Sequence, residues 1–418
     1  MAANRGHLLS TINIKTPFTF RNGTQSKNRF FKSAMSEQLA DENHNPGEGL
    51  CKLYKLWAKG GAGIVVTGNI MIDREHLGEP KNIVLDKESE LGTFRDWVAS
   101  GTENNTQLWA QLNHPGKQSP KFIQAVPLAP SAIPLEGALQ NNFNLPRALE
   151  EDDIHHIVSK FWESAALAKS AGFCGVQIHA AHGYLISQFL SPRHNKRKDN
   201  WGGSLENRMR FLMEVYRGIR NAVGDDFPIA VKLNSADFMK GGFSESDSME
   251  VARALADAGI DLIEISGGSY EAPAMAEGIK QKSSTQKREA YFLEFAKRLR
   301  ETVSVPIVVT GGFRSVDAMN QALSRHASDL IGIARPLAVD PDLPNKALAD
   351  PNFKIQLRPL STGLKKIDDM ILLNMSWYEA QFDRIAKGKA PKPELNEWYA
   401  AWKVFLNLGV YAFRKRRA

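Results

Sequence analysis

The stretch Gly175-Val176-Gln177-Ile178-His179-Ala180-Ala181-His182-Gly183-Tyr184 places two imidazoles and a phenol directly after a short, mostly apolar run. A short run of this kind is consistent with a buried strand of a parallel sheet. In a (β/α)₈ barrel the catalytic residues lie at the C-terminal ends of the strands. The stretch therefore predicts polar chemistry at the mouth of such a barrel.

Seven further apolar runs follow the same pattern, with amphipathic helical stretches between them. They are residues 30–35, 63–67, 107–112, 229–233, 262–266, 306–310 and 330–333. Eight runs with intervening helices predict an α/β fold, a parallel (β/α)₈ TIM barrel. Ile12–Ile14 and Pro17–Phe20, with Asn22-Gly23 as a turn, predict an N-terminal β-hairpin cap.

The chain of 418 residues suits one barrel with insertions. We expect the barrel over residues 1–350 and a C-terminal helical extension with a basic tail over residues 351–418. The net charge of +7 suits anionic ligands such as nucleotide phosphates, but it does not distinguish them from a membrane surface or nucleic acid. No known nucleic-acid-binding module occurs, so we expect no nucleic-acid partner.

The cysteine content and the N-terminus favour a cytoplasmic location. Cys51 and Cys174 are the only cysteines, which suits a reducing compartment. Two thiols are also too few for an iron–sulfur cluster, which needs about four. Met1 to Arg5 lack the apolar core of a signal peptide.

Trp398 to Phe413 form an aromatic-rich, mostly apolar segment before the basic residues Arg414–Arg417. The segment is short for a membrane span, which takes about 20 residues. A docked or dimer-contacting helix is the favoured interpretation. Weak membrane-surface contact through an interfacial anchor is the alternative.

His179 and His182 suit a pair of donors that grip a carbonyl oxygen and stabilise developing negative charge. The alternatives are structural histidines or two ligands of a metal site, but zinc requires a third clustered ligand and none is evident. Tyr184 carries a phenol with an ordinary pKa of about 10, so it can donate a proton to a carbanion. An aromatic side chain that only packs at the strand–helix junction is its alternative.

The segment His179 to Leu185, continued through Ser191-Pro192 to Asp199-Asn200-Trp201-Gly202-Gly203-Ser204-Leu205-Glu206-Asn207-Arg208, strongly resembles the signature of the Old Yellow Enzyme family. The resemblance covers roughly residues 10–350. It implies tightly but non-covalently bound FMN, NADPH or NADH as reductant, and ping-pong reduction of small activated alkenes, the α,β-unsaturated carbonyl compounds. In that cycle His179 and His182 polarise the acceptor and Tyr184 protonates its α-carbon.

The resemblance also implies the residues that contact FMN. They are Ala34, Met35, Ser36, Gly68, Gln111, Lys232, Gly311, Gly312, Ala334 and Arg335. Ser36 stands where many relatives have Cys or Thr, and Gly68 is expected to end the second strand. Lys232 replaces the usual Arg opposite the flavin, which keeps the charge but loses the planar fork. A structural ion pair is the alternative role for Lys232, because a buried charge needs a partner.

The phosphate site is expected after the last two strands, as in other barrels. Gly311-Gly312 expose backbone N–H groups and Arg335 adds positive charge. Taken alone, a Gly-Gly pair is usually only a turn. Ala334 replaces the glycine that the family normally shows there.

Other functions remain open on the same scaffold. An NADH oxidase that uses oxygen, or a dedicated biosynthetic reductase, would need the same flavin site. A non-catalytic flavin-binding redox sensor is a further alternative, and the intact His179, His182 and Tyr184 argue against it. Selectivity is expected in residues 118–149, around Phe238 and in residues 269–280. Family relatives often associate at the barrel rim, which implies a homo-oligomer.

Overall fold

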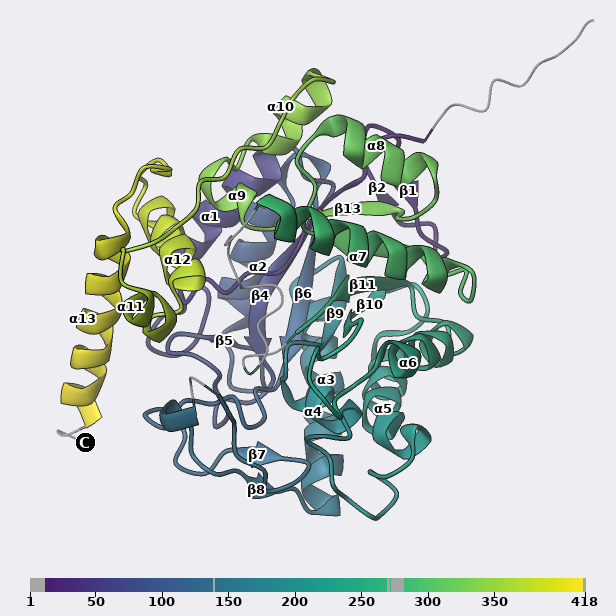
Figure 1. The fold of residues 1–418 in the computed structure, drawn as a ribbon, viewed down its shortest axis with the longest axis vertical. Coiled ribbons are helices and arrows are strands. Elements are labelled where there is room, and N and C mark those ends of the chain that lie inside the picture. The colour runs from purple at the N-terminus through teal and green to yellow at the C-terminus, as the bar shows by residue number, and fades with distance from the viewer. Residues whose placement is uncertain (1–11, 138–139, 269–270, 272–281, 416–418) are drawn as a thin grey trace, which may run out of the picture.

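The computed structural model describes residues 12–137, 140–268, 271 and 282–415. In this part of the chain eight parallel strands close into a barrel (Figure 1). The strands are β3 (Phe30–Lys32), β4 (Ile64–Met71), β6 (Gln107–Asn113), β9 (Gly175–Ala180), β10 (Ile229–Asn234), β11 (Leu262–Ser266), β12 (Ile307–Thr310) and β13 (Leu330–Ile333). Closure comes from β3, which pairs with β4 on one side and with β13 on the other. The predicted (β/α)₈ barrel is confirmed, with all eight runs on its strands.

The N-terminal hairpin is confirmed, but its strands differ from the prediction. β1 (Phe18–Thr19) pairs antiparallel with β2 (Gln25–Ser26) around the Asn22-Gly23 turn, where Gly23 has a φ of 85°. The expected strand at residues 12–14 does not form, because the N–H of Ile14 donates instead to the Asn320 side chain at 3.0 Å.

The hairpin packs against the inside of the barrel. Phe18 and Phe20 join a buried apolar cluster contributed by the inward-facing strand residues. Its strand members are Phe31, Ile64, Val66, Trp109, Ala230, Leu262, Val308 and Leu330. The ring centroids of Phe20 and Trp109 lie 5.3 Å apart. This apolar layer fills one end of the barrel and leaves the C-terminal ends of the strands for polar side chains.

Helices follow the strands and surround the barrel. They are α1 (Glu48–Lys59), α2 (Leu91–Gly101), α3 (Glu151–Ala171), α4 (Leu185–Leu190), α5 (Leu205–Val223), α6 (Glu245–Asp257), α7 (Lys282–Arg300), α8 (Val316–Ser324), α9 (Pro336–Val339) and α10 (Leu343–Ala349). Ser204, Ser244 and Ser315 cap the N-termini of α5, α6 and α8 by accepting a hydrogen bond from a backbone N–H. Such caps fix where each helix begins after its loop.

Short additional strands lie in the loops at the C-terminal ends of the barrel strands. β5 (Ile83–Val84) extends the sheet beside the end of β4. β7 (Leu128–Ala129) and β8 (Arg147–Ala148) pair with each other inside the long excursion at residues 118–149. Of the expected selectivity segment 269–280, only Glu271 belongs to the described residues.

The predicted C-terminal extension is helical and lies against the barrel. It contains α11 (Lys365–Met370), α12 (Leu373–Ala386) and α13 (Glu397–Lys415), which lie together beside α1 in Figure 1. α12 contacts α1, where the rings of Trp57 and Phe382 meet edge to face with centroids 5.5 Å apart. The extension is therefore packed on the barrel.

The first half of α13 is docked on α12. Ala400 and Ala401 are buried, and the Lys403 ammonium lies 3.2 Å from a carboxylate oxygen of Asp383 on α12. Trp398 and Trp402 remain exposed at 46% and 58%. Residues 416–418, at the end of the basic tail, lie outside the described residues. No helix in the part of the chain that the structure describes is long and apolar enough to cross a bilayer.

Candidate active site

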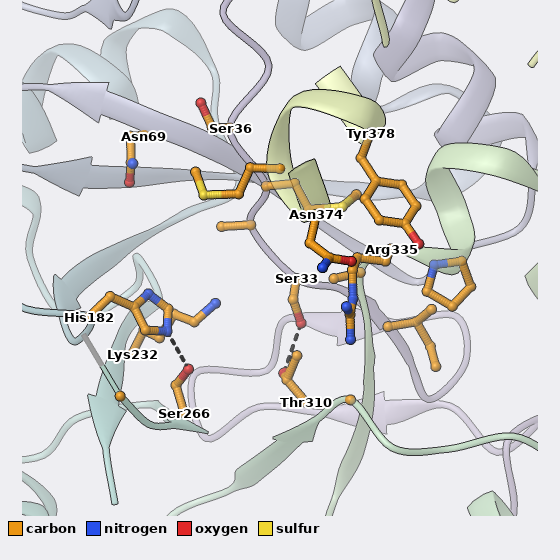
Figure 2. Close-up of a pocket in the computed structure, with 18 of the residues that line it drawn as sticks. Ser33, Ser36, Asn69, His182, Lys232, Ser266, Thr310, Arg335, Asn374 and Tyr378 are labelled. Atoms are coloured by element: carbon orange, nitrogen blue, oxygen red, sulfur yellow. Dashed lines mark hydrogen bonds between the residues drawn. The ribbon is translucent and has the colours of Figure 1, made fainter. Parts of the chain in front are cut away.

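A cavity of about 310 Å³ opens at the C-terminal ends of the barrel strands. Its lining comes from the strand ends on one side and from α12 on the other. Figure 2 shows His182, Lys232 and Ser266 on one side of the cavity, and Arg335, Asn374 and Tyr378 on the opposite side. The cavity therefore joins two chemically different regions.

The structure brings nearly all of the predicted site residues to this cavity. They are Ala34, Met35, Ser36, Gln111, His179, His182, Tyr184, Lys232, Gly311, Gly312, Ala334 and Arg335. These residues come from six different strands or the turns that follow them, so closure of the barrel is what gathers them.

Gly68 is the exception among the predicted residues. It lies inside β4, which continues to Met71, and it does not line the cavity. Its N–H donates to Glu37 at 3.0 Å, and a Cβ added to it would meet a Glu37 oxygen at 2.1 Å. The pairing of β4 with β6 shifts between Val66 and Asn69, and it is Asn69 that lines the cavity. The expectation that the second strand ends at Gly68 is wrong.

His179 and His182 are held as neutral imidazoles. Their ring centroids lie 5.1 Å apart. Burial, and after it the nearby Lys232 ammonium, lower the pKa of His182 to about 3. Burial, His182 and Lys232 together hold the pKa of His179 well below its ordinary value. Neither ring carries a charge at neutral pH, so each offers one N–H donor.

The hydrogen bonds of the two rings fix which nitrogens remain for a ligand. The N–H of Ala181 donates to Nδ1 of His179 at 3.3 Å. Because a neutral ring accepts at only one nitrogen, the proton of His179 is on Nε2. Nε2 of His182 lies 2.6 Å from the Ser266 hydroxyl, and its backbone has a φ of 61°. Ser266 therefore fixes the orientation of the second ring.

Tyr184 stands beside this pair. Its ring centroid is 4.8 Å from that of His179, and the side chain is 5% exposed. The amide of Asn69 donates to its hydroxyl oxygen at 3.3 Å. Asn69 was not predicted, although a polar residue two positions after the apolar run 63–67 is a signal that sequence reading can detect.

Lys232 already has a protein partner. Its ammonium lies 3.1 Å from Glu264 on the neighbouring strand β11, with side-chain exposures of 5% and 0%. The structural ion pair considered from the sequence is therefore present. Lys232 also lines the cavity, so it faces both the carboxylate and any ligand.

Glu264 is the centre of a buried hydrogen-bond chain across the barrel. Gln111 donates to Gln177 at 2.7 Å, and Gln177 donates to Glu264 at 2.8 Å. Thr310 donates to the other carboxylate oxygen at 2.7 Å, and its hydroxyl is 2.8 Å from that of Ser33. The chain connects residues of five strands or strand ends, and sequence reading did not find it.

The opposite end of the cavity is built for an anion. Gly311 and Gly312 have φ values of 86° and 88°, a conformation that favours glycine. Arg314 and Arg335 line the same end together with Tyr378 of α12. Burial raises the pKa of Tyr378, and the positive charges of Arg335 and Arg314 oppose this rise. The Gly311 N–H, expected from the sequence to be exposed, instead donates to the Gly332 carbonyl at 3.0 Å because β12 pairs with β13. The guanidinium groups at this end are donors that suit a phosphate.

Several cavity residues escaped the sequence analysis. The α12 residues are Asn374, Met375, Tyr378, Glu379 and Phe382. Glu79, in the loop after β4, accepts a hydrogen bond from the Ser36 hydroxyl, and burial raises its pKa. No local pattern marks these residues, because only tertiary packing brings α12 to the barrel mouth.

The residues present fit FMN. One end supplies phosphate donors, and the other supplies an amide, an ammonium and two neutral imidazoles around a cavity that mixes polar and apolar walls. No group of three or more His, Cys, Asp or Glu side chains among the described residues is arranged to hold a metal ion.

A barrel whose cavity has cationic donors at one end and a His-His-Tyr cluster at the other has the arrangement expected of a flavin-dependent oxidoreductase. Residues 13–352 match the model of the NADH:flavin oxidoreductase / NADH oxidase family, and the chain belongs to this family. Membership confirms the expected enzyme class, the FMN cofactor and a nicotinamide reductant at the level of the family.

Individual proteins of this family are similar over most of the chain. The NADH-dependent flavin oxidoreductase iccE of Talaromyces variabilis is 36% identical over 364 residues, covering 82% of this chain and 88% of that protein. The NADH-dependent flavin oxidoreductase iliE of Hypocrea jecorina (strain QM6a) is 35% identical over 369 residues, covering 83% and 91%.

Solved structures agree with the fold. The 2-naphthoyl-CoA reductase complex has a TM-score of 0.75 at 27% identity, and the match covers 82% of this chain but 53% of that one. This chain thus spans about half of that larger protein. The old yellow enzyme homologue from Zymomonas mobilis has a TM-score of 0.70 at 25% identity, covering 82% and 94%.

Proposed function

We propose that the protein reduces the activated C=C bond of α,β-unsaturated carbonyl compounds, with NADH as reductant, in a ping-pong cycle. The observation that carries this proposal is the neutral imidazole pair beside a phenol in one cavity. The relatives iccE and iliE are both named NADH-dependent flavin oxidoreductases, which favours NADH over NADPH.

The imidazole pair suits the carbonyl oxygen of such a substrate. A neutral imidazole N–H donates without bringing a full positive charge into the cavity. The Nε2–H of His179 is free of the Ala181 contact that occupies Nδ1. Donors held in place before reaction stabilise the charge that develops on the oxygen.

Tyr184 suits the proton transfer. Its hydroxyl is held by Asn69 at 3.3 Å, beside the His179 ring. A phenol in this position donates a proton to the substrate α-carbon. FMN, when bound, would supply the hydride chemistry that connects the nicotinamide to the alkene. The protein then contributes orientation, the donors and the proton.

The test is an anaerobic two-step titration of the purified FMN-loaded protein. NADH is added first, followed by 2-cyclohexenone, and the visible flavin absorbance is recorded. We expect bleaching by NADH and recovery on addition of the enone. Tyr184→Phe is the comparison variant. NADH should bleach its flavin absorbance at the normal rate, but the absorbance should recover slowly when the enone is added.

Other outcomes select the alternatives. Recovery with oxygen but with no enone, enal or quinone indicates an NADH oxidase and contradicts the proposal. A yellow protein that NADH does not bleach indicates a flavin-binding sensor. Failure to take up FMN overturns the proposed function entirely.

A further inference from the structure

Glu264 is a fully buried carboxylate directly behind the cavity wall. It lies on β11, and its side chain does not line the cavity. One of its oxygens accepts from Thr310 at 2.7 Å and lies 3.1 Å from the Lys232 ammonium. The other oxygen accepts from Gln177 at 2.8 Å. Each carboxylate oxygen therefore contacts a side chain that lines the cavity or one that is hydrogen-bonded to such a side chain.

The carboxylate determines the direction of the hydrogen-bond chain. A carboxylate has only acceptors, so Gln177 must turn its amide nitrogen toward Glu264. The carbonyl oxygen of Gln177 then faces Gln111 and accepts from the Gln111 amide nitrogen at 2.7 Å. The amide nitrogen of Gln111 is thereby committed to the chain, and its carbonyl oxygen is left as an acceptor for the cavity that Gln111 lines.

The same carboxylate holds Lys232. An ammonium has three donors, and the contact with Glu264 uses one of them. Lys232 and Gln111 stand two strands apart on the same rim, because β9, with Gln177, lies between β10 and β6. This end of the barrel therefore presents a hydrogen-bond acceptor, the Gln111 carbonyl oxygen, and a cation, the Lys232 ammonium, to the same edge of a bound ligand.

We propose that Glu264 is a positioning residue for FMN. It orients Gln111 so that the Gln111 carbonyl oxygen accepts a hydrogen bond from the flavin N3–H. It also partly neutralises the Lys232 ammonium, which faces the flavin carbonyl next to N3. The inference rests on FMN binding in this cavity, as in the proposed function. The flavin pyrimidine edge carries one N–H donor between two carbonyl oxygens, which matches an acceptor beside a cation. Glu264 acts on this edge only through Gln111 and Lys232.

Two measurable consequences follow. FMN should bind more tightly than its N3-methyl analogue, which lacks the donor, because the Gln111 acceptor would be left unpaired. A lost buried hydrogen bond of this kind corresponds to a factor of about 10 to 100 in affinity. Pairing with Glu264 should also weaken the preference of Lys232 for reduced over oxidised FMN, and so lower the flavin potential.

The experiment compares three variants of the FMN-loaded enzyme. Glu264→Gln should raise the ratio of the oxidised to the reduced FMN dissociation constants about tenfold, a shift of about +30 mV for a two-electron couple. It should also reduce the preference for FMN over N3-methyl-FMN to about threefold or less. Gln177→Met breaks the chain but keeps the ion pair, so it should lose the same preference without a change in potential.

Asp261→Asn is the matched control. Asp261 lies just before the first residue of β11, is buried and pairs with Arg220 at 2.5 Å, far along the strand from the cavity. This variant should change neither the potential nor the preference. Similar changes in Asp261→Asn would show a general effect of losing a buried carboxylate and would overturn the inference.

The remaining outcomes are also decisive. If Glu264→Gln keeps the wild-type potential and the wild-type preference, the inference is wrong while the proposed function stands. If Glu264→Gln does not fold, Gln177→Met decides the matter. An unchanged preference of Gln177→Met for FMN over N3-methyl-FMN overturns the role of the hydrogen-bond chain, and a lost preference supports it. Wild-type protein that binds no FMN defeats the proposed function itself.

Discussion

The two walls of the cavity differ in origin, but each holds an ionisable group whose neutral form is favoured. The strand-end wall carries His179, His182 and Tyr184, which lie within six consecutive residues. The α12 wall comes from a helix that begins at Leu373, beyond the end of the family match at residue 352. The barrel therefore carries the groups that we propose to react, whereas the extension completes the enclosure of the cavity.

In each wall, burial drives one ionisable group toward its neutral form. The pKa of His182 falls to about 3, first through burial and then through Lys232. The pKa of Glu379 on α12 rises to about 8, first through burial and then through the nearby Glu79. A buried base loses its proton and a buried acid keeps it, so the two walls should respond to pH with opposite sign.

The largest expected effect is on the strand-end wall. Tyr184→Phe should slow flavin reoxidation by 2-cyclohexenone by a factor of about 10² to 10⁴, the usual contribution of a general acid. Flavin reduction by NADH should stay close to the wild-type rate. Stopped-flow absorbance measures the two half-reactions separately, and an equal loss in both would assign Tyr184 to binding.

At the phosphate end both walls meet, and Arg335→Ala should weaken FMN binding. A charge-assisted hydrogen bond contributes about 1.5 to 3 kcal/mol, so we expect the dissociation constant to rise by a factor of about 10 to 100. Fluorescence titration of apoprotein with FMN measures the effect. Lys346→Ala, which removes a surface cation paired with Asp340, is the control. A normal FMN affinity in Arg335→Ala would exclude Arg335 from the phosphate site.

His182 should make the apoprotein lose stability in acid. Its folded pKa lies below the unfolded value of about 6.5, so the unfolded state binds more protons between pH 6.5 and 3. The free energy of unfolding therefore falls with falling pH in this window, by at most about 1.4 kcal/mol per pH unit from this group. In His182→Asn the fall should be shallower. Urea unfolding at pH 7.5 and 5 tests this, and equal slopes would contradict it.

Glu379 should act in the opposite direction. Its folded pKa of about 8 exceeds the ordinary value of 4.5, so stability is fully present below pH 4.5 and is lost as pH rises toward 8. Gln38 donates to this carboxyl group at 2.9 Å, and a glutamine at position 379 can still accept this bond. Glu379→Gln should therefore stabilise the apoprotein at pH 8.5 and have little effect at pH 5. A stability gain that is independent of pH would disprove the role of ionisation.

The smallest effect on turnover is expected on the exposed side of α13, a helix that packs on α12 and whose described side chains do not line the cavity. Trp398 and Trp402 are exposed beside the docked half of this helix. A double Trp398→Ser, Trp402→Ser variant should keep enone turnover within about twofold, as surface changes usually do. Sedimentation without liposomes tests the expected homo-oligomer, and sedimentation with anionic liposomes tests the membrane alternative. If the double variant sediments like the wild type under both conditions, the exposed face of Trp398 and Trp402 takes part in neither contact.

Prediction from sequence succeeded where the signal is local. Eight apolar runs specify the barrel because buried parallel strands are largely apolar, with few polar side chains. Gly311-Gly312 and Arg335 follow such runs directly, so the end of the strand also places them. The prediction failed at Gly68, where an irregular register in β4 turns Asn69 to the cavity, and at the hairpin, where Asn320 rather than a strand holds Ile14.

The sequence by itself determined the barrel, the family and the His-His-Tyr cluster, because neighbouring residues on one strand end stay together in any correct fold. The tertiary structure decided which distant groups surround them. Lys232 meets Glu264 only because β10 and β11 pair in a register that aligns the two residues. Glu379 reaches the cavity only because α12 packs on the barrel. Contacts across the closed barrel depend on register and closure, and neither property is encoded in a local run of residues.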